Sequence, residues 1–397
     1  MARALLAAGA VIAVVAVAGC GAGSGSRVDG GAKGDPLAPP GSAPTFSRAG
    51  WRTDFARHAV PLREITSGGP GKDGIPALDH PRFVGIGAAR RFLGAVEQVA
   101  VVRVGRAVKA YPLEIMIWHE IVNDRLAGRP IAFTYCPLCN STVALSRRAA
   151  GRTLSFGTTG NLRGSDLVMY DRQTESWWQQ ITGQAIVGKL TGTRLRILPS
   201  QILSFARFER LYPNGRVLSI HTGYSRPYGQ NPYVGYDQPQ SPPFGLPTHS
   251  NPALPPKERV AVVATGKHSA TIYPFSRLER EAPVDDRIPR AGAVAERPIV
   301  VFFDPKLVSP LDGPEVSLGR EVGTAAVFSR RLGRRTLTFA RGPSPGSFRD
   351  DQTRSVWGMS GSAISGPLRG RRLQPVTSND EFWFAAAAFY PDADIRR

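Results

Sequence analysis

Cysteine, acidic residues and long apolar runs are all scarce in this sequence of 397 residues. It contains 3 cysteines, and 31 acidic residues stand against 50 Lys and Arg, which gives a net charge of +19. The basic residues are scattered and form no cluster interleaved with aromatics, so the charge does not indicate a nucleic-acid-binding protein. After residue 16, no segment is apolar enough to cross a bilayer.

Two well-known catalytic motifs are also absent. H-E-x-x-H does not occur in the sequence. The glycine-rich stretch at residues 68–74 is not a phosphate-binding loop, because Lys72 is followed by Asp73 instead of Ser or Thr. We expect this stretch to be an arm rich in turns.

The N-terminus has the features of an export signal. Arg3 supplies a positive charge, and residues 4–16 form an apolar run that is too short for a spanning helix. Residues 17–20 read Val-Ala-Gly-Cys, which resembles the lipobox of bacterial lipoproteins. The segment 1–20 is therefore predicted to be a lipoprotein signal peptide, with Cys20 as the lipidated residue. An ordinary signal peptide with a chance cysteine is the alternative.

The segment after the signal is predicted to be a tether. Residues 21–50 are rich in Gly, Ser, Pro and Ala and contain little that could be buried, so a flexible chain is expected there. The predicted protein is exported and anchored to the cell membrane by lipid. Its expected partners are the membrane, through the anchor, and an unknown small molecule or envelope protein, but no nucleic acid.

Much of the remaining chain matches itself. Similar segments recur in the same order in two halves, which indicates a tandem duplication. We assign a first repeat to residues 60–220, a loop rich in Pro and Tyr to 221–256, and a second, degenerate repeat to 257–395. The matching pairs are 111–113 with 273–275, 129–133 with 297–301, 152–156 with 335–339, and 173–178 with 352–357.

The two copies differ where reactive residues stand. Tyr135-Cys136-Pro137-Leu138-Cys139 in the first copy faces Phe303-Asp304-Pro305-Lys306-Leu307 in the second, so both cysteines are lost. Trp118-His119-Glu120 likewise faces Arg280-Glu281-Ala282. Residues kept in both copies are expected to serve the fold, whereas those found only in the first are candidates for function.

The local patterns predict short strands and short helices. Residues 99–104 and 108–111 alternate around Gly105 and predict a hairpin, and a second hairpin is predicted between 143–146 and 153–157. The apolar spacing at 113–126 predicts a helix that ends before Gly128, and residues 204–211 predict another. The expected fold class is α+β, a tandem duplication of a mostly antiparallel β domain with short helices.

Long motifs in the chain match a known family. They are Ser67-Gly68-Gly69-Pro70-Gly71-Lys72-Asp73-Gly74-Ile75-Pro76-Ala77-Leu78-Asp79, Tyr111-Pro112-Leu113, Trp118-His119-Glu120-Ile121-Val122-Asn123-Asp124, Thr134-Tyr135-Cys136-Pro137-Leu138-Cys139-Asn140, residues 165–180, and Pro255-Pro256-Lys257-Glu258-Arg259-Val260. With them the chain resembles the DUF3179 family over residues 64–392. The resemblance implies an exported bacterial or archaeal protein, and it implies no biochemical activity, since the family is named for having none assigned.

Cys136 and Cys139 carry the candidate chemistry. Two thiolates at this spacing can bind one soft metal ion, zinc or copper. They can also cycle between dithiol and disulfide, or form an inert structural disulfide. With Cys20 lipidated, they remain as an even pair in an oxidising compartment, which leaves all three interpretations open.

His119 and Glu120 are the candidates to complete a metal site. The helix that carries them is expected to fold back, through the connection at Gly128, onto the strand that ends at Cys136. His119 would then be a third ligand, and Glu120 a fourth ligand or a partner of the imidazole. The alternative is that His119 belongs to the core and Glu120 to the surface.

A polar pocket beside the cysteines is the last expectation. Asp166, Arg172 and Gln180 are its candidates, and Gln173, Thr174, Ser176 and Trp178 are interpreted as a structural turn with a core aromatic residue. The leading functional hypothesis is a metal-binding envelope lipoprotein. The alternatives are a thiol–disulfide oxidoreductase that uses Cys136 and Cys139, and a non-catalytic surface binding protein with a structural disulfide.

Overall fold

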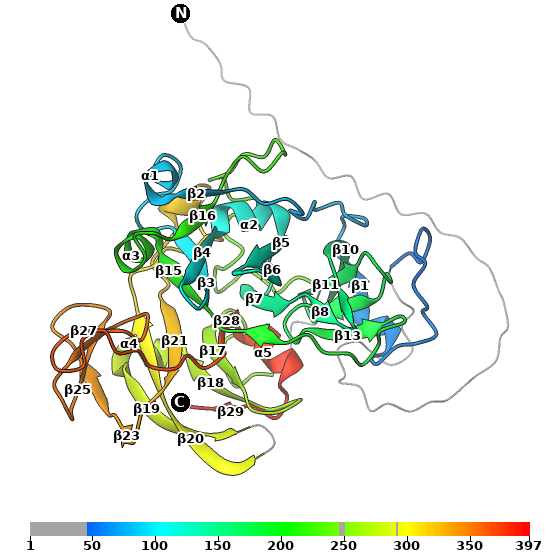
Figure 1. The fold of residues 1–397 in the computed structure, drawn as a ribbon. Coiled ribbons are helices and arrows are strands. Elements are labelled where there is room, and N and C mark those ends of the chain that lie inside the picture. Colours follow the sequence, from blue (N-terminus) through cyan, green and yellow to red (C-terminus); the bar gives the residue numbers. More distant parts are fainter. Residues whose placement is uncertain (1–45, 246–250, 291–292) are drawn as a thin grey trace, which may run out of the picture. The chain divides into compact units, whose positions relative to one another are not determined.

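Antiparallel strands dominate the computed structural model, which describes residues 46–245, 251–290 and 293–397 (Figure 1). The α-helices of this part are short, with 4 to 7 residues each. The predicted α+β class is therefore confirmed. The predicted signal peptide, Cys20 and residues 21–45 of the predicted tether lie outside the described residues. Within the described ranges, no helix is long and apolar enough to cross a membrane.

The first half begins with a five-stranded sheet in the order β15-β3-β4-β16-β2. Its β3 and β4 form the predicted hairpin around Gly105, whose positive φ of 61° suits glycine. On one side of β4, β16 pairs in parallel. The elements here are β2 (Phe83–Gly85), α1 (Ile86–Ala89), β3 (Gln98–Val104), β4 (Ala107–Pro112), β15 (Ser200–Ser204), α3 (Phe205–Leu211) and β16 (Arg216–Leu218).

A four-stranded sheet in the order β14-β7-β6-β5 carries the cysteines. Here β6 pairs antiparallel with both β5 and β7. Their bounds, with the preceding helix, are α2 (Leu113–His119), β5 (Ile121–Leu126), β6 (Arg129–Cys136), β7 (Ser141–Ser146) and β14 (Ile197–Leu198).

The structure corrects two predictions in this region. The helix predicted over 113–126 ends at His119, because Glu120 has a φ of 56° and the β-branched Ile121 and Val122 then continue as a strand. The hairpin predicted between 143–146 and 153–157 does not form, because β7 pairs with β6 and β14 instead. Only a two-residue ladder forms at the Gly151 turn, between β8 (Arg148–Ala149) and β9 (Arg152–Thr153).

A second five-stranded sheet, in the order β1-β10-β11-β12-β13, completes the first half. Neighbouring strands in it are antiparallel. It delivers Asp166, the first residue of β11. Its elements are η1 (Leu62–Glu64), β1 (Ile65–Ser67), β10 (Phe156–Arg163), β11 (Asp166–Asp171), β12 (Trp177–Gln179) and β13 (Gln184–Val187).

The second half contains similar sheets. The order β28-β17-β18-β29 again has two antiparallel pairs followed by one parallel pair, as in β15-β3-β4-β16. Two further sheets have the orders β19-β20-β21 and β24-β25-β26-β27. The elements are β17 (Arg259–Ala264), β18 (Ala270–Pro274), α4 (Phe275–Glu281), β19 (Val284–Arg290), β20 (Ala293–Asp304), η2 (Val316–Leu318), β21 (Thr324–Ser329), β22 (Arg331–Leu332), β23 (Arg335–Thr336), β24 (Phe339–Arg341), β25 (Ser347–Asp350), β26 (Val356–Gly358), β27 (Ala363–Ser365), β28 (Asn379–Phe382), α5 (Trp383–Phe389) and β29 (Asp394–Ile395).

The two halves share core packing. One buried cluster combines Val101 and Leu203 from the first half with Phe302 and Phe348 from the second. The largest cluster surrounds the cysteines and also takes in Phe382 and Phe384 of the second half. The second half therefore supplies part of the wall around the residues with candidate chemistry.

Candidate metal centre

Cys136 and Cys139 lie at the two ends of a tight connection between β6 and β7. Cys136 is the last residue of β6 and pairs with Ser141, the first residue of β7. The Asn140 N–H donates to the carbonyl of Pro137 at 3.2 Å, and the φ of 54° at Asn140 is one that Asn tolerates better than most residues. Both cysteine side chains are buried, with at most 1% exposed.

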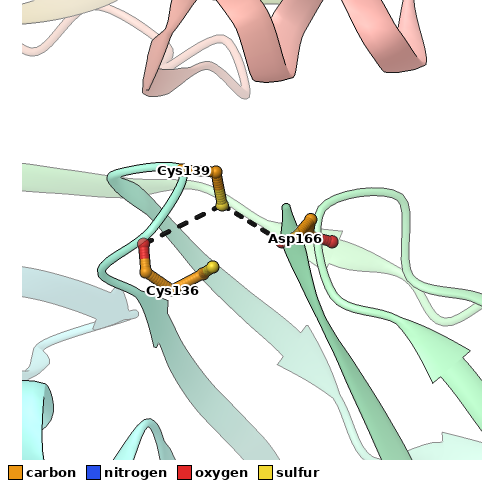
Figure 2. A group of neighbouring side chains, drawn as sticks. All are labelled: Cys136, Cys139 and Asp166. Atoms are coloured by element: carbon orange, nitrogen blue, oxygen red, sulfur yellow. Dashed lines mark hydrogen bonds between the residues drawn. The ribbon is translucent and has the colours of Figure 1, made fainter. Parts of the chain in front are cut away.

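Asp166 joins the two cysteines. Its Oδ1 lies 3.3 Å from Cys139 Sγ, and one ligand atom from each of the three residues lies within 4.8 Å of the others. Figure 2 shows the two cysteines on their connection and Asp166 beside them on the neighbouring strand. Asp166 had been predicted only as part of a polar pocket, and the structure places it directly against Cys139.

Two hydrogen bonds fix the second carboxylate oxygen of Asp166, the one that does not face Cys139. Its Oδ2 accepts from Gln179 Nε2 at 2.6 Å and from the Ile181 N–H at 3.0 Å. Burial nevertheless raises the pKa of Asp166 to about 6, against the lowering effect of these bonds. The orientation of the carboxylate is thus fixed, and its Oδ1 faces Cys139 Sγ.

Gln180 and Ser141 form a second layer around Cys139. Ser141 Oγ lies 3.1 Å from Cys139 Sγ and donates to Gln180 Oε1 at 2.8 Å, while Gln180 Nε2 donates to Thr134 Oγ1 at 3.0 Å. Because the Ser141 hydroxyl donates its proton to Gln180, the lone pairs of the hydroxyl oxygen face the sulfur of Cys139. The prediction that Gln180 lies beside the cysteines agrees with this arrangement.

Both cysteines are free thiols in the structure. Burial raises the pKa of Cys136, and it raises the pKa of Cys139 well above its usual range. The thiol form is therefore favoured in the metal-free protein. A bound cation would reverse this preference, since a coordinated thiol is deprotonated.

The segment between the two predicted repeats covers the cysteine connection. Tyr236 Oη donates to the carbonyl of Leu138 at 2.9 Å, and the Ser165 hydroxyl donates to the carbonyl of Phe244. From the second half, the Phe382 N–H donates to the carbonyl of Cys139 at 3.0 Å. These contacts explain why the cysteines are shielded from solvent.

His119 does not join the cysteines, contrary to the sequence prediction. Its Nδ1 lies 2.8 Å from the carbonyl of Pro76, and its Nε2 lies 2.6 Å from Tyr228 Oη. A carbonyl can only accept, so Nδ1 carries the proton and Nε2 accepts from Tyr228. Burial also lowers the pKa of His119. The reason for the wrong prediction is β5, which separates the end of α2 from β6.

Glu120 interacts electrostatically with Asp166 and Cys136, although it is not one of the three grouped residues. The Tyr135 N–H donates to the Glu120 carbonyl at 2.8 Å, which places Glu120 beside the end of β6. Burial, and next the charge of Asp166, raise the pKa of Glu120 to about 8. At neutral pH it is therefore a protonated neighbour of the site.

Arg172 is absent from the site, so its predicted place in the pocket is wrong. Its guanidinium lies 3.3 Å from a carboxylate oxygen of Asp73, on the turn-rich arm, and 3.3 Å from one of Asp79, which follows the arm. Arg172 follows β11 at the end opposite to Asp166, and this opposite position explains the error. The turn interpretation of Thr174 and Trp178 does agree with the structure, since both donate to the carboxylate of Asp171.

Lys257 and Tyr135 are polar residues near the cysteines that sequence reasoning missed. Among the described residues, neither Lys257 Nζ nor Tyr135 Oη has a hydrogen-bond partner, although both atoms are buried. Both interact electrostatically with Cys139. Lys257 stands within one of the long motifs of the sequence, and this was the one signal that could have marked it.

The comparisons with known proteins identify a family without an assigned activity. A family model described as a protein of unknown function, DUF3179, matches residues 72–393. No curated protein and no solved structure matches the chain. The chemistry of the site therefore rests on its own residues.

Proposed function

The chain belongs to the DUF3179 family of proteins of unknown function, and we propose from the geometry of its own residues that it binds a transition metal through Cys136, Cys139 and Asp166. The observation that carries the proposal is the convergence of these three buried side chains from β6, the connection after it, and β11. In their ionised forms, three such neighbouring groups would repel one another, and a cation is the partner that suits three anions.

The donor set and its spacing fit such an ion. Zinc–sulfur bonds are about 2.3 Å long, so two sulfur ligands of one ion lie at most about 4.6 Å apart. The donor atoms here lie within 4.8 Å of one another, so small side-chain movements would allow all three to reach one ion. Two thiolates and one carboxylate suit zinc, and the thiolates also suit copper.

Three protein ligands leave a coordination position open. Structural zinc sites commonly use four protein ligands, whereas catalytic sites use three and keep the fourth for water or substrate. Gln179 and Gln180 add the outer layer that orients ligands in such sites. We therefore propose a metal site in which one coordination position is not filled by Cys136, Cys139 or Asp166.

The burial of the thiols favours metal binding over thiol–disulfide exchange. Exchange requires a thiolate that a partner disulfide can reach. Cys136 and Cys139 are at most 1% exposed, and burial raises the pKa of both thiols. Their free state also gives no support to a structural disulfide.

We propose further that the two halves arose by duplication and that the first one holds the function. In the second half, Asp304 stands in place of Cys136 and pairs with Arg207 at 2.5 Å. Leu307 stands in place of Cys139 and belongs to the core. The similar sheet orders of the halves support this interpretation. The export signal and the lipid anchor at Cys20 remain proposals from the sequence.

Elemental analysis of protein purified under reducing conditions without a His-tag tests the proposal. The wild-type chain is expected to contain or take up about one equivalent of zinc or copper. The double variant Cys136→Ser, Cys139→Ser is expected to bind none, and Asp166→Asn is expected to bind at least about tenfold more weakly. A free-thiol count is expected to find both cysteines unreactive in the metal-loaded protein and reactive after chelation and unfolding.

His119→Gln is the matched control. It changes the residue that the sequence pattern favoured as a ligand, while the structure leaves it outside the site. This variant is expected to keep its metal. A folded Cys136→Ser, Cys139→Ser variant with undiminished metal content would refute the proposed site. Loss of metal from a folded His119→Gln variant would instead support His119 as a ligand together with the two cysteines.

A further inference from the structure

Lys257 is an ammonium-bearing residue buried next to the proposed metal site. It lies just before β17, in the second half, and only 6% of it is exposed. Its Nζ has no hydrogen-bond partner among the described residues. A buried amine of this kind is costly for the fold, so its position calls for an explanation.

Three aromatic rings enclose the amine. Lys257 Nζ lies 3.1 Å from the ring centroid of Tyr236, 4.8 Å from that of Phe382 and 5.2 Å from that of Phe384. Aromatic faces attract a cation without accepting a conventional hydrogen bond. The rings therefore hold the side chain in place and leave its charge available to another group.

The same rings fix Lys257 relative to the cysteines. Tyr236 Oη donates to the carbonyl of Leu138, and the Phe382 N–H donates to that of Cys139. Among acidic groups, Lys257 interacts electrostatically first with Asp237 and next with Cys139. In the metal-free chain, burial lowers the pKa of Lys257 to about 7. Bringing negative charge to the cysteine site would favour its charged form.

The charges of the loaded site do not balance without this residue. Two thiolates and a carboxylate carry three negative charges, and a divalent ion leaves one of them uncompensated in a buried place. Arg259, another cation of this region, is already paired with Asp237 at 2.7 Å. In the metal-free protein, burial raises the pKa of both Glu120 and Glu381 to about 8, which favours their neutral forms.

We propose that Lys257 is the counter-charge of the metal site and makes it electrically neutral when Cys136, Cys139 and Asp166 bind a divalent ion. This inference rests on the proposed metal-binding function. Lys257 is a positioning and charge-balancing residue: it touches the aromatic rings, and it acts on the ion through the field at Cys139. Because Lys257 belongs to the second half, the second half would contribute to metal binding by the ligands of the first half.

The test compares zinc affinity in the full-length wild type, Lys257→Met and the exposed-lysine control Lys267→Met. Affinity is measured by competition with a chromogenic chelator. Met keeps the length of the side chain and its packing on the rings but removes the charge. Lys257→Met is expected to bind zinc roughly tenfold more weakly or worse, because the loaded site then keeps a buried net charge. Lys267→Met is expected to bind like the wild type.

The stability of the metal-free protein distinguishes charge balance from a structural role. If Lys257 acts as a counter-charge, Lys257→Met unfolds at the same or a higher urea concentration than the wild type when metal is absent. A structural role predicts unfolding at a lower concentration. If Lys257→Met fails to fold, Lys257→Gln provides the same comparison.

The outcomes separate this inference from the function on which it rests. A wild-type chain that binds no zinc refutes the proposed function. Zinc binding by the wild type with equal affinity in folded Lys257→Met refutes the counter-charge alone. Weaker zinc binding together with a less stable metal-free variant also rejects it, in favour of a purely structural role.

Discussion

Glu114 is a buried carboxyl group whose protonation is tied to folding. It is 3% exposed, and its Oε1 has no hydrogen-bond partner among the described residues. Burial, and next the charge of Glu97, raise the pKa of Glu114 to about 8 from a usual 4.5. Because the folded state holds this proton more tightly than the unfolded state, the contribution to stability is complete below pH 4.5 and is lost as the pH rises through about 8.

Glu114→Gln is therefore expected to flatten the pH dependence of stability. An amide does not ionise, so the variant avoids a decrease in the free energy of unfolding on the order of 3 kcal/mol between pH 5 and pH 8. Urea unfolding at several pH values measures this difference. The exposed Glu279→Gln is the control and is expected to follow the wild type. Parallel curves for Glu114→Gln and the wild type would contradict the raised pKa.

At the scale of elements, one turn occurs in both halves with the same hydrogen bonds. Between β11 and β12, Asp171 accepts from the Thr174 N–H at 2.7 Å and from Trp178 Nε1 at 2.9 Å. Between β25 and β26, Asp350 accepts from the Thr353 N–H at 2.6 Å and from Trp357 Nε1 at 2.8 Å. Both turns thus use a buried carboxylate to connect a loop to a core tryptophan.

Asp171→Asn and Asp350→Asn are expected to destabilise the protein by similar amounts. The amide group of Asn cannot accept from both donors through both of its terminal atoms, so each change costs roughly 2–3 kcal/mol. The decrease is measured by thermal or urea unfolding, with the exposed Asp54→Asn as a neutral control. Asp350→Asn is also expected to keep its zinc affinity under conditions where it is folded. A large cost at one turn and none at the other would argue against equivalent roles.

At the scale of the whole molecule, the two halves depend on each other. They share a core cluster, and Phe382 of the second half bonds to the carbonyl of Cys139 in the first. A variant with only residues 60–220 would lack the part of the wall that the second half supplies and would expose the cysteine site. The second half is therefore a structural part of the proposed metal centre, although it has no cysteines of its own.

The predicted lipid anchor concerns the whole molecule as well. Cys20→Ser is expected to move the protein from the membrane fraction to the soluble extracytoplasmic fraction, because a lipid chain and not a spanning helix would hold it. Fractionation followed by immunodetection measures the shift, and an unchanged melting temperature of the purified variant shows that folding is intact. A Cys20→Ser variant that still requires detergent for extraction would contradict the anchor.

The sequence by itself determined some of the elements and the reactive pair. The period-two alternation around Gly105 predicted β3 and β4, and Ser204 marked the start of α3, because these signals depend on neighbouring residues alone. The loss of both cysteines from the second half identified Cys136 and Cys139 as candidates for function. The proximity of Asp166 and Gln180 to this pair was also anticipated, though not which of them would reach a sulfur atom.

Only the tertiary structure decided what surrounds the cysteines. The positive φ at Glu120 ends α2 and begins β5, and this break in the chain sends His119 to Tyr228 and away from the sulfur atoms. Lys257 reaches the site from more than a hundred residues away, against the rings of Tyr236 and Phe382, two residues that donate hydrogen bonds to the cysteine connection. Such contacts depend on how sheets from both halves pack, and local periodicity carries no information about packing between segments so distant in the chain.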